Sequence, residues 1–258
     1  QLGFKTEKIQ QEIDNAIQLA KTDSRPSLII CRTHIGYGLP TKQDTAKAHG
    51  EPPGEEELNA AKVNLGWPLH PQFFIPGDAL KVFRDVGKNG EEKAKRWQKD
   101  LSNYSRQFPE KGAEFLRRFE AKFPEGWTTS LPVFEADEKG MATRVASGQA
   151  LNGLTSVLPE LVGGSADLTP SNNTTIKSSS AFTSENPIGK YLHFGVREHG
   201  MGGIVNGIAY HKGLIPFGAT FMVFTDYMRP SIRLSALSHL HCIWVMTHDS
   251  VGLGEDGP

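Results

Sequence analysis

Residues 161–172 read LVGGSADLTPSN, an apolar run that ends in a glycine turn and leads into polar residues. Similar runs follow at residues 191–194, 215–223 and 243–246, and a turn follows each of them. Helical stretches are predicted at residues 140–154 and 198–210. Helices that alternate with short buried strands are typical of a parallel sheet covered by helices on both faces. The sequence therefore predicts the α/β class.

The first half of the chain has a different pattern. Ile9, Ile13 and Ile17 recur at helical spacing, which predicts a helix that begins at Thr6. Residues 28–31, LIIC, are typical of a short strand buried on both faces. The glycine- and proline-rich residues 36–54 predict a long functional loop, and residues 55–65 predict a helix. Charged helices that begin near residues 78, 91 and 109 are predicted to form a connecting layer.

Composition limits the classes of function. The 258 residues include 28 Lys and Arg against 29 Asp and Glu, so the net charge is -1. This balance supplies no basic field for nucleic acid or anionic lipid, and no apolar run approaches the roughly 18 residues of a membrane span. Cys31 and Cys242 lack metal or redox spacing, which predicts buried, reduced thiols in a reducing compartment such as the cytoplasm. Because the chain begins at Gln1 without an initiator Met, we expect a longer protein to contain it.

Polar residues stand just past several of the apolar runs. His34, Asp167, Glu198 and His248 all have this position. In an open parallel sheet, ligands bind outside the carboxyl ends of the strands, where the loops converge. Turns also favour polar residues, so each residue taken alone could serve as a cap or a turn former.

Glu198 and a nearby aromatic repeat are candidate ligand-binding features with two interpretations each. Four glycines lie within the eight residues 200–207, and each would cost a helix about 1 kcal/mol relative to alanine. They indicate close approach by a ligand or another backbone, although Glu198 equally suits the first turn of a helix. Phe221, Phe224 and Tyr227 recur every three residues, which fits core packing or an aromatic pocket for a flat heterocycle.

Two polar loops are further candidates. Residues 163–172 suit an anionic or polyhydroxylated ligand and equally suit an ordinary turn. Residues 248–258, HDSVGLGEDGP, could bind sugar hydroxyls or move protons. No three candidate ligands have a recognisable metal-site spacing, so no metal site is predicted within the chain.

Five motifs in this sequence resemble the transketolase family, and they occur in that family's order. The motifs are IGYG (35–38), HG (49–50), GGSADLTPSN (163–172), REHGMGGIVNGIA (197–209) and THDSVGLGEDGP (247–258). The resemblance implies a thiamine diphosphate enzyme that moves a two-carbon ketol unit from a ketose phosphate to an aldose phosphate. It also implies a homodimer whose active site lies between subunits, and a division into the end of a diphosphate-binding domain (1–108), a connector (109–136) and part of a pyrimidine-binding domain (137–258).

The resemblance also implies roles for individual residues. Glu198 would contact a ring nitrogen of the cofactor's pyrimidine and act in catalysis. The other cofactor contacts would come from Phe221, Phe224, Tyr227, Asp167 and His49. The substrate would be held by Arg144 and Ser171 at its phosphate, by His49 and His248 as catalytic residues near the reacting groups, and by Asp256 at a donor hydroxyl.

The sequence also departs from the family pattern. The family's Gly-Asp-Gly motif, with an Asn about thirty residues later, is absent, so the ligands of Mg²⁺ are expected outside this chain. We therefore expect the chain to be inactive alone, as the central part of an enzyme of the pentose phosphate pathway or the Calvin cycle, in the cytoplasm or a plastid. Dihydroxyacetone synthase and a non-catalytic binding module are the alternatives.

Overall fold

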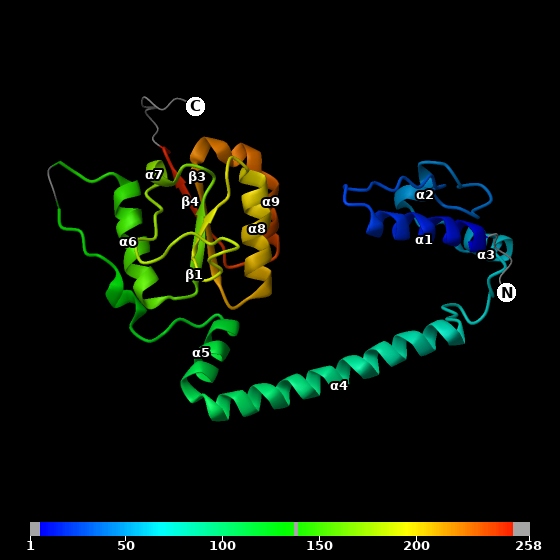
Figure 1. The fold of residues 1–258 in the computed structure, drawn as a ribbon. Coiled ribbons are helices and arrows are strands. Elements are labelled where there is room, and N and C mark those ends of the chain that lie inside the picture. Colours follow the sequence, from blue (N-terminus) through cyan, green and yellow to red (C-terminus); the bar gives the residue numbers. More distant parts are fainter. Residues whose placement is uncertain (1–5, 137–138, 250–258) are drawn as a thin grey trace. The chain divides into compact units, whose positions relative to one another are not determined.

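The computed structural model describes residues 6–136 and 139–249. The chain divides into unit 1, Gln1–Ala94, and unit 2, Lys95–Pro258, which are described separately here. The boundary falls inside the long helix α4, Gly77–Gln107 (Figure 1). Within the described ranges, no helix has both the length and the apolar composition needed to cross a membrane.

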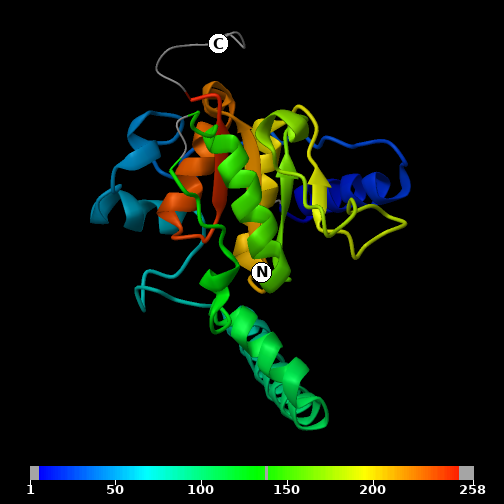
Figure 2. The ribbon, with the colours of Figure 1, turned by 90° about the vertical axis from the view of Figure 1, so that its left-hand side faces the viewer.

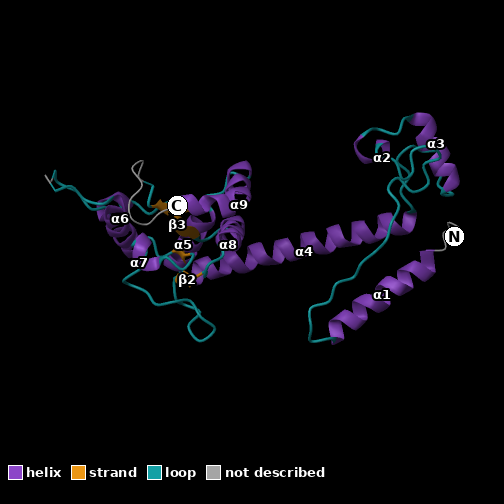
Figure 3. Ribbon diagram, turned by 90° about the horizontal axis from the view of Figure 1, so that it is seen from above, coloured by secondary structure: helices purple, strands orange, loops and turns teal. Residues whose placement is uncertain are grey.

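Unit 1 consists of helices and loops, which Figure 3 colours by type. Its helices are α1 (Thr6–Thr22), α2 (Lys47–Gly50), α3 (Glu55–Asn64) and the first part of α4. The predicted helices at 6–20 and 55–65 are confirmed. The two helices predicted near residues 78 and 91 are one continuous helix of 31 residues, which runs through Gly87 and Gly90.

The strand predicted at residues 28–31 is wrong. This segment is exposed coil, and the side chains of Leu28 and Ile30 are each 85% accessible. Residues 6–94 contain no strand with which it could pair, and an unpaired strand leaves its backbone N–H and C=O groups without partners. For the same reason Cys31 is exposed rather than buried.

Unit 2 contains a four-stranded sheet in the order β2-β1-β3-β4, and every pair of neighbours is parallel. The sheet confirms the α/β prediction. The strands are β1 (Leu161–Ser165), β2 (Tyr191–His193), β3 (Ile215–Phe221) and β4 (Ile243–Thr247). The remaining helices of the unit are α5 (Pro109–Phe119), η1 (Trp127–Ser130), α6 (Thr143–Val157), α7 (Thr169–Asn172), α8 (Glu198–His211), η2 (Met222–Phe224) and α9 (Thr225–Leu237).

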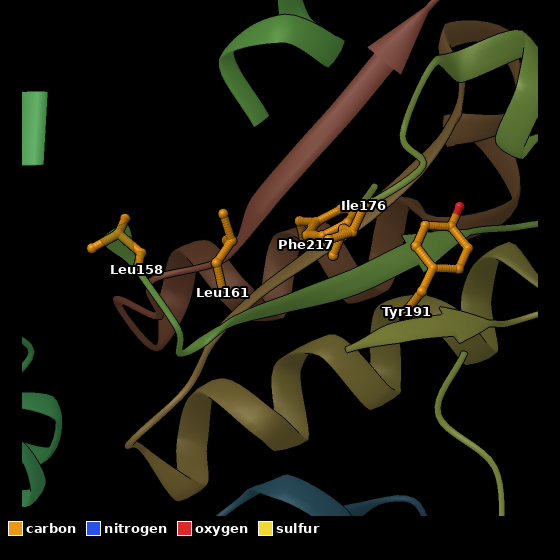
Figure 4. Packing of buried hydrophobic residues seen from close by; sticks show 5 residues of the cluster. All are labelled: Leu158, Leu161, Ile176, Tyr191 and Phe217. Atoms are coloured by element: carbon orange, nitrogen blue, oxygen red, sulfur yellow. The ribbon is translucent and has the colours of Figure 1, made fainter. Parts of the chain in front are cut away.

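Helices cover both faces of this sheet, with α6 on one face and α8 and α9 on the other (Figures 1 and 2). Successive strand residues point to opposite faces, so β4 places Val245 toward α6 and Trp244 toward α8 and α9. The buried cluster on the α6 face consists of Leu158, Leu161, Ile176, Tyr191 and Phe217 (Figure 4). The cluster on the other face consists of Ala166, Phe194, Met201, Val205 and Met228.

The glycine pair of β1 is explained by close strand packing. A Cβ atom at Gly164 would lie 1.8 Å from the carbonyl oxygen of Leu192 in β2. No side chain fits at that distance, so glycine is required for β1 to pair with β2. The sheet then holds the carboxyl ends of its strands side by side.

Candidate functional site

A candidate residue follows each strand of the sheet at its carboxyl edge. Asp167 follows β1, Glu198 follows β2, Phe224 follows β3 and His248 follows β4, whereas His34 follows coil. Asp167 and His248 have left-handed backbones, with φ of 61° and 56°. A non-glycine residue in this region costs about 1–3 kcal/mol, and such strain gathers at functional sites. This edge is therefore the candidate site.

Glu198 is the first residue of α8 and is only 8% exposed. The hydroxyl of the fully buried Thr220 in β3 donates a 3.4 Å hydrogen bond to Glu198 Oε1. The amino end of α8 favours negative charge through its free N–H groups. The Thr220 hydroxyl in β3 and the amino end of α8 thus hold the carboxyl group in place.

The aromatic repeat forms a row of rings beside β3. The rings of Phe221 and Phe224 stack with centroids 5.6 Å apart and 6° between their planes, and Phe224 lies 6.0 Å from Tyr227. None of the three belongs to the buried clusters on the two faces of the sheet, and Tyr227 is 66% exposed. The row therefore lies outside the two buried clusters, with Phe221 and Phe224 half-buried at the end of β3.

The imidazole of His248 contacts Phe221, Arg144 and Thr247 at this edge. Its ring centroid lies 3.8 Å from that of Phe221. Its Nε2 atom lies 2.8 Å from Arg144 Nη1, and its Nδ1 atom lies 3.0 Å from Thr247 Oγ1. Arg144 comes from the first turn of α6 and is exposed, and Ser171, on α7, is half-buried. The fold thus joins residues 104 positions apart in the sequence.

A buried polar network contacts Thr247, the residue that precedes His248. Asn172 Nδ2 donates to Thr247 Oγ1 at 2.5 Å, and Ser165 Oγ donates to Asn172 Oδ1 at 2.7 Å. Sequence reasoning did not single out Thr220, Asn172 or Thr247. Asn172 and Thr247 stood within quoted motifs, but only the parallel sheet brings these two residues, 75 positions apart, into contact.

His49 lies in unit 1, on the short helix α2. The preceding loop is tied to α3 by Glu57, whose carboxylate accepts hydrogen bonds from the backbone N–H groups of Thr41 and Lys42 and from the Thr41 hydroxyl. The bond from the Thr41 backbone is the main reason that the pKa of Glu57 lies below its usual value. Asp256 lies outside the described residues.

A parallel sheet with a buried carboxyl group, a row of rings and a cationic side chain at its carboxyl edge defines an α/β domain of the ligand-binding kind. Two family models match this chain. Residues 4–124 match "Transketolase, thiamine diphosphate binding domain", and residues 139–258 match "Transketolase, pyrimidine binding domain". The chain belongs to the transketolase family.

Curated relatives agree with this membership. The chain is 48% identical over 250 residues to a transketolase of Nostoc sp.. This match covers 96% of this chain and 37% of the relative. It is 46% identical to chloroplastic transketolase-1 of Arabidopsis thaliana, over 96% of this chain and 34% of the relative. The chain thus spans little more than a third of the length of these relatives.

Solved structures give the same fold. The transketolase of Leishmania mexicana superposes with a TM-score of 0.78 at 40% identity, over 96% of this chain and 37% of that chain. A transketolase of Pichia stipitis in complex with sedoheptulose 7-phosphate superposes with a TM-score of 0.78 at 37% identity, over 96% of this chain and 38% of that chain. The fold is therefore the thiamine diphosphate-binding α/β fold.

Proposed function

We propose that this chain is part of a transketolase. The parent enzyme transfers a two-carbon ketol unit from a ketose phosphate, such as xylulose 5-phosphate, to an aldose phosphate, such as ribose 5-phosphate. The observation that carries this proposal is the buried Glu198 carboxyl group, which is hydrogen-bonded to Thr220 at the end of β3, the strand that leads into the row of Phe221, Phe224 and Tyr227. The chain alone is inactive, because it spans about 37% of its relatives and holds only part of a site.

The residues at this edge fit the pyrimidine of thiamine diphosphate. A buried carboxyl group can share a proton with a ring nitrogen, and aromatic side chains hold a flat heterocycle by stacking and edge contacts. When bound, the cofactor supplies the electron sink for carbanion chemistry. Glu198 holds the proton at the ring nitrogen, and the aromatic row orients the ring. Asp167 supports the cofactor from the turn after β1.

The substrate is bound by residues from α6, α7 and the segment after β4. The guanidinium of Arg144 and the hydroxyl of Ser171 donate to the sugar phosphate, a task suited to a forked donor. His248 lies within hydrogen-bond distance of Arg144 and contacts the substrate near its reacting groups. Asp256 accepts a hydrogen bond from a donor hydroxyl, and His49 contacts both cofactor and substrate.

Homodimerisation and Mg²⁺ belong to the same proposal. Gly203 and Gly207 lie on an exposed face of α8, and a Cβ atom at either would meet nothing within 4 Å. This smooth face supports close approach by a second subunit, with the active site between the two. Mg²⁺ binds with the diphosphate to residues outside this chain. The enzyme acts in the cytoplasm or, as the chloroplastic relative suggests, in a plastid.

Glu198→Ala in the full-length enzyme tests the proposal. We expect ketol transfer to be abolished while the circular-dichroism spectrum stays nearly unchanged, because Glu198 lies at a helix end rather than in a buried cluster. Glu185→Ala, at an exposed loop residue, is the matched control and should keep full activity. Substantial turnover by Glu198→Ala would remove Glu198 from the mechanism.

A further inference from the structure

We infer that Tyr191 is a positioning residue for Ser171. Its buried hydroxyl contacts Thr169, the first residue of α7, and Thr174, two residues past the end of α7, and so holds the short helix that carries Ser171. These two contacts are called the α7 clamp here. The inference rests on the proposed function, in which Ser171 donates to the sugar phosphate. It adds a residue of β2 to the phosphate end of the site.

The first step concerns α7, which is too short to hold its own position. It has four residues, far fewer than the roughly 12 that an isolated helix needs for marginal stability. The N–H groups of Asn173 and Thr174 donate the bonds that close its last turn, and these bonds are long, at 3.4 and 3.3 Å. Contacts with neighbouring elements must therefore fix α7.

The second step concerns the hydroxyl of Tyr191, which contacts both ends of α7. Its oxygen lies 2.6 Å from Thr169 Oγ1 and 3.1 Å from Thr174 Oγ1. A phenol can donate one hydrogen bond and accept another, so one group satisfies both threonines. Burial raises the pKa of Tyr191, so the hydroxyl keeps its proton at neutral pH. Tyr191 is 5% and Thr174 1% exposed, so water does not readily replace these bonds.

The third step concerns what fixes Tyr191. It is the first residue of β2, and it pairs with Gly163 of β1 in the parallel ladder. Its ring belongs to the buried cluster on the α6 face, which also contains Ile176 and Phe217 (Figure 4). The backbone and the ring of Tyr191 are thus both part of the rigid sheet. The α7 clamp therefore ties the helix that carries Ser171 to the sheet.

The fourth step relates Ser171 to Arg144. A Cβ atom at Gly148 in α6 would lie 2.6 Å from the carbonyl oxygen of Asn173, so α6 packs directly against the end of α7. Gly148 lies four residues after Arg144, which places the two on one face of α6. A shift of α7 would move the Ser171 hydroxyl relative to the Arg144 guanidinium. A phosphate bound by both side chains would then lose the hydrogen bond from Ser171.

Tyr191→Phe tests the α7 clamp, because it removes the hydroxyl and keeps the ring. In the 258-residue chain, hydrogen exchange of the Asn173 and Thr174 amides should be at least about fivefold faster, the effect of one lost hydrogen bond. Ser235→Ala is the matched control, because it removes a buried hydroxyl that bonds to Asn206 on the other face of the sheet. It should change these rates less than about twofold. Unchanged exchange in Tyr191→Phe, or equal acceleration in Ser235→Ala, would overturn the inference.

Kinetics of the full-length enzyme test the link to Ser171. Tyr191→Phe should raise KM for ribose 5-phosphate at least about fivefold, and should leave kcat, and KM for ribose without phosphate, within about twofold. A general loss of folded protein would instead lower kcat with both acceptors. In Ser171→Ala, the added Tyr191→Phe should change KM less than about twofold, because the hydroxyl that Tyr191 positions is already absent. A larger added change would overturn the inference.

Two further comparisons complete the test. If Tyr191→Phe does not fold, Thr174→Val takes its place and should accelerate exchange of the Asn173 amide, whereas Thr174→Ser, which keeps the hydroxyl, should not. Unchanged exchange in Thr174→Val would contradict the α7 clamp. A raised KM for ribose 5-phosphate in Ser171→Ala but not in Tyr191→Phe would overturn the inference. Accelerated exchange in Tyr191→Phe with an unchanged KM in both variants would support the α7 clamp and contradict the phosphate role of Ser171 in the proposed function.

Discussion

Arg117→Met should strongly destabilise unit 2. Arg117 lies in α5, and its Nη1 atom is 2.8 Å from Oε1 of Glu160, the residue that precedes β1. The Glu160 side chain is 3% exposed and that of Arg117 is 15% exposed, so water does not screen this ion pair. The substitution keeps most of the apolar stem and removes the charge. The Glu160 carboxylate is then buried beside Arg118, whose Nε atom lies 3.9 Å away.

The magnitude follows from this burial. Breaking a buried ion pair by removing one partner costs about 3–5 kcal/mol. Because Arg118 stays near Glu160, we expect the lower end, about 3 kcal/mol. Hydrogen exchange of the β1 amides is the suitable assay, because it reports on unit 2 alone. A loss of 3 kcal/mol should accelerate exchange through global opening by about 100-fold.

Two further variants make the comparison specific. Arg229→Met breaks the exposed ion pair of Arg229 with Asp226 and should cost less than about 1 kcal/mol. Arg117→Met combined with Glu160→Leu removes both charges of this pair and should recover part of the lost stability, because Glu114, the other partner of Arg117, still keeps Arg118. Equal exchange rates in Arg117→Met and Arg229→Met would refute the assignment of a buried, stabilising ion pair.

Two other predictions concern pH and a helix glycine. Hydrogen bonds from Arg117, above all, lower the pKa of Glu114 from 4.5 to about 2, so its contribution to stability is complete above about pH 4.5 and is lost as the pH falls toward about 2. Glu114→Gln should therefore show a flatter fall in the free energy of unfolding over this range, and an equally steep fall would contradict the pairing. Gly203→Ala should stabilise this chain by about 1 kcal/mol in chemical denaturation yet weaken assembly of the full-length dimer. Gly202→Ala, whose Cβ atom would lie 2.5 Å from that of Ser231, should destabilise it, and unimpaired dimerisation of Gly203→Ala would count against the proposed dimer face.

The elements of unit 2 could be predicted because burial imposes a local pattern on the sequence. The apolar runs at the four strands and the helical spacing in α6 and α8 indicate which side chains are buried on folding. The same reasoning failed for residues 28–31. Their apolar pattern is that of a buried strand, but a strand forms only with neighbours, which residues 6–94 do not contain.

The candidate site could be predicted only in part. Glu198, Phe221 and His248 follow strands, and that position directed attention to them. Their motifs, through the resemblance, suggested roles. Asn172 and Thr247 stand in two of these motifs, but the sequence suggested no role for either, because a polar residue near a strand end has many ordinary explanations. Their importance lies in contacts, which sequence spacing does not express.

The amino-acid sequence by itself determined the α/β class, the order of the strands along the chain and the membership of the five motifs in one family. These properties depend on local periodicity and on residue types in a fixed order. The tertiary structure alone decided that Arg144 meets His248, that Asn172 meets Thr247 and that the aromatic row stays outside the core. Those contacts join residues up to 104 positions apart, and only the pairing of parallel strands places such residues within hydrogen-bond distance.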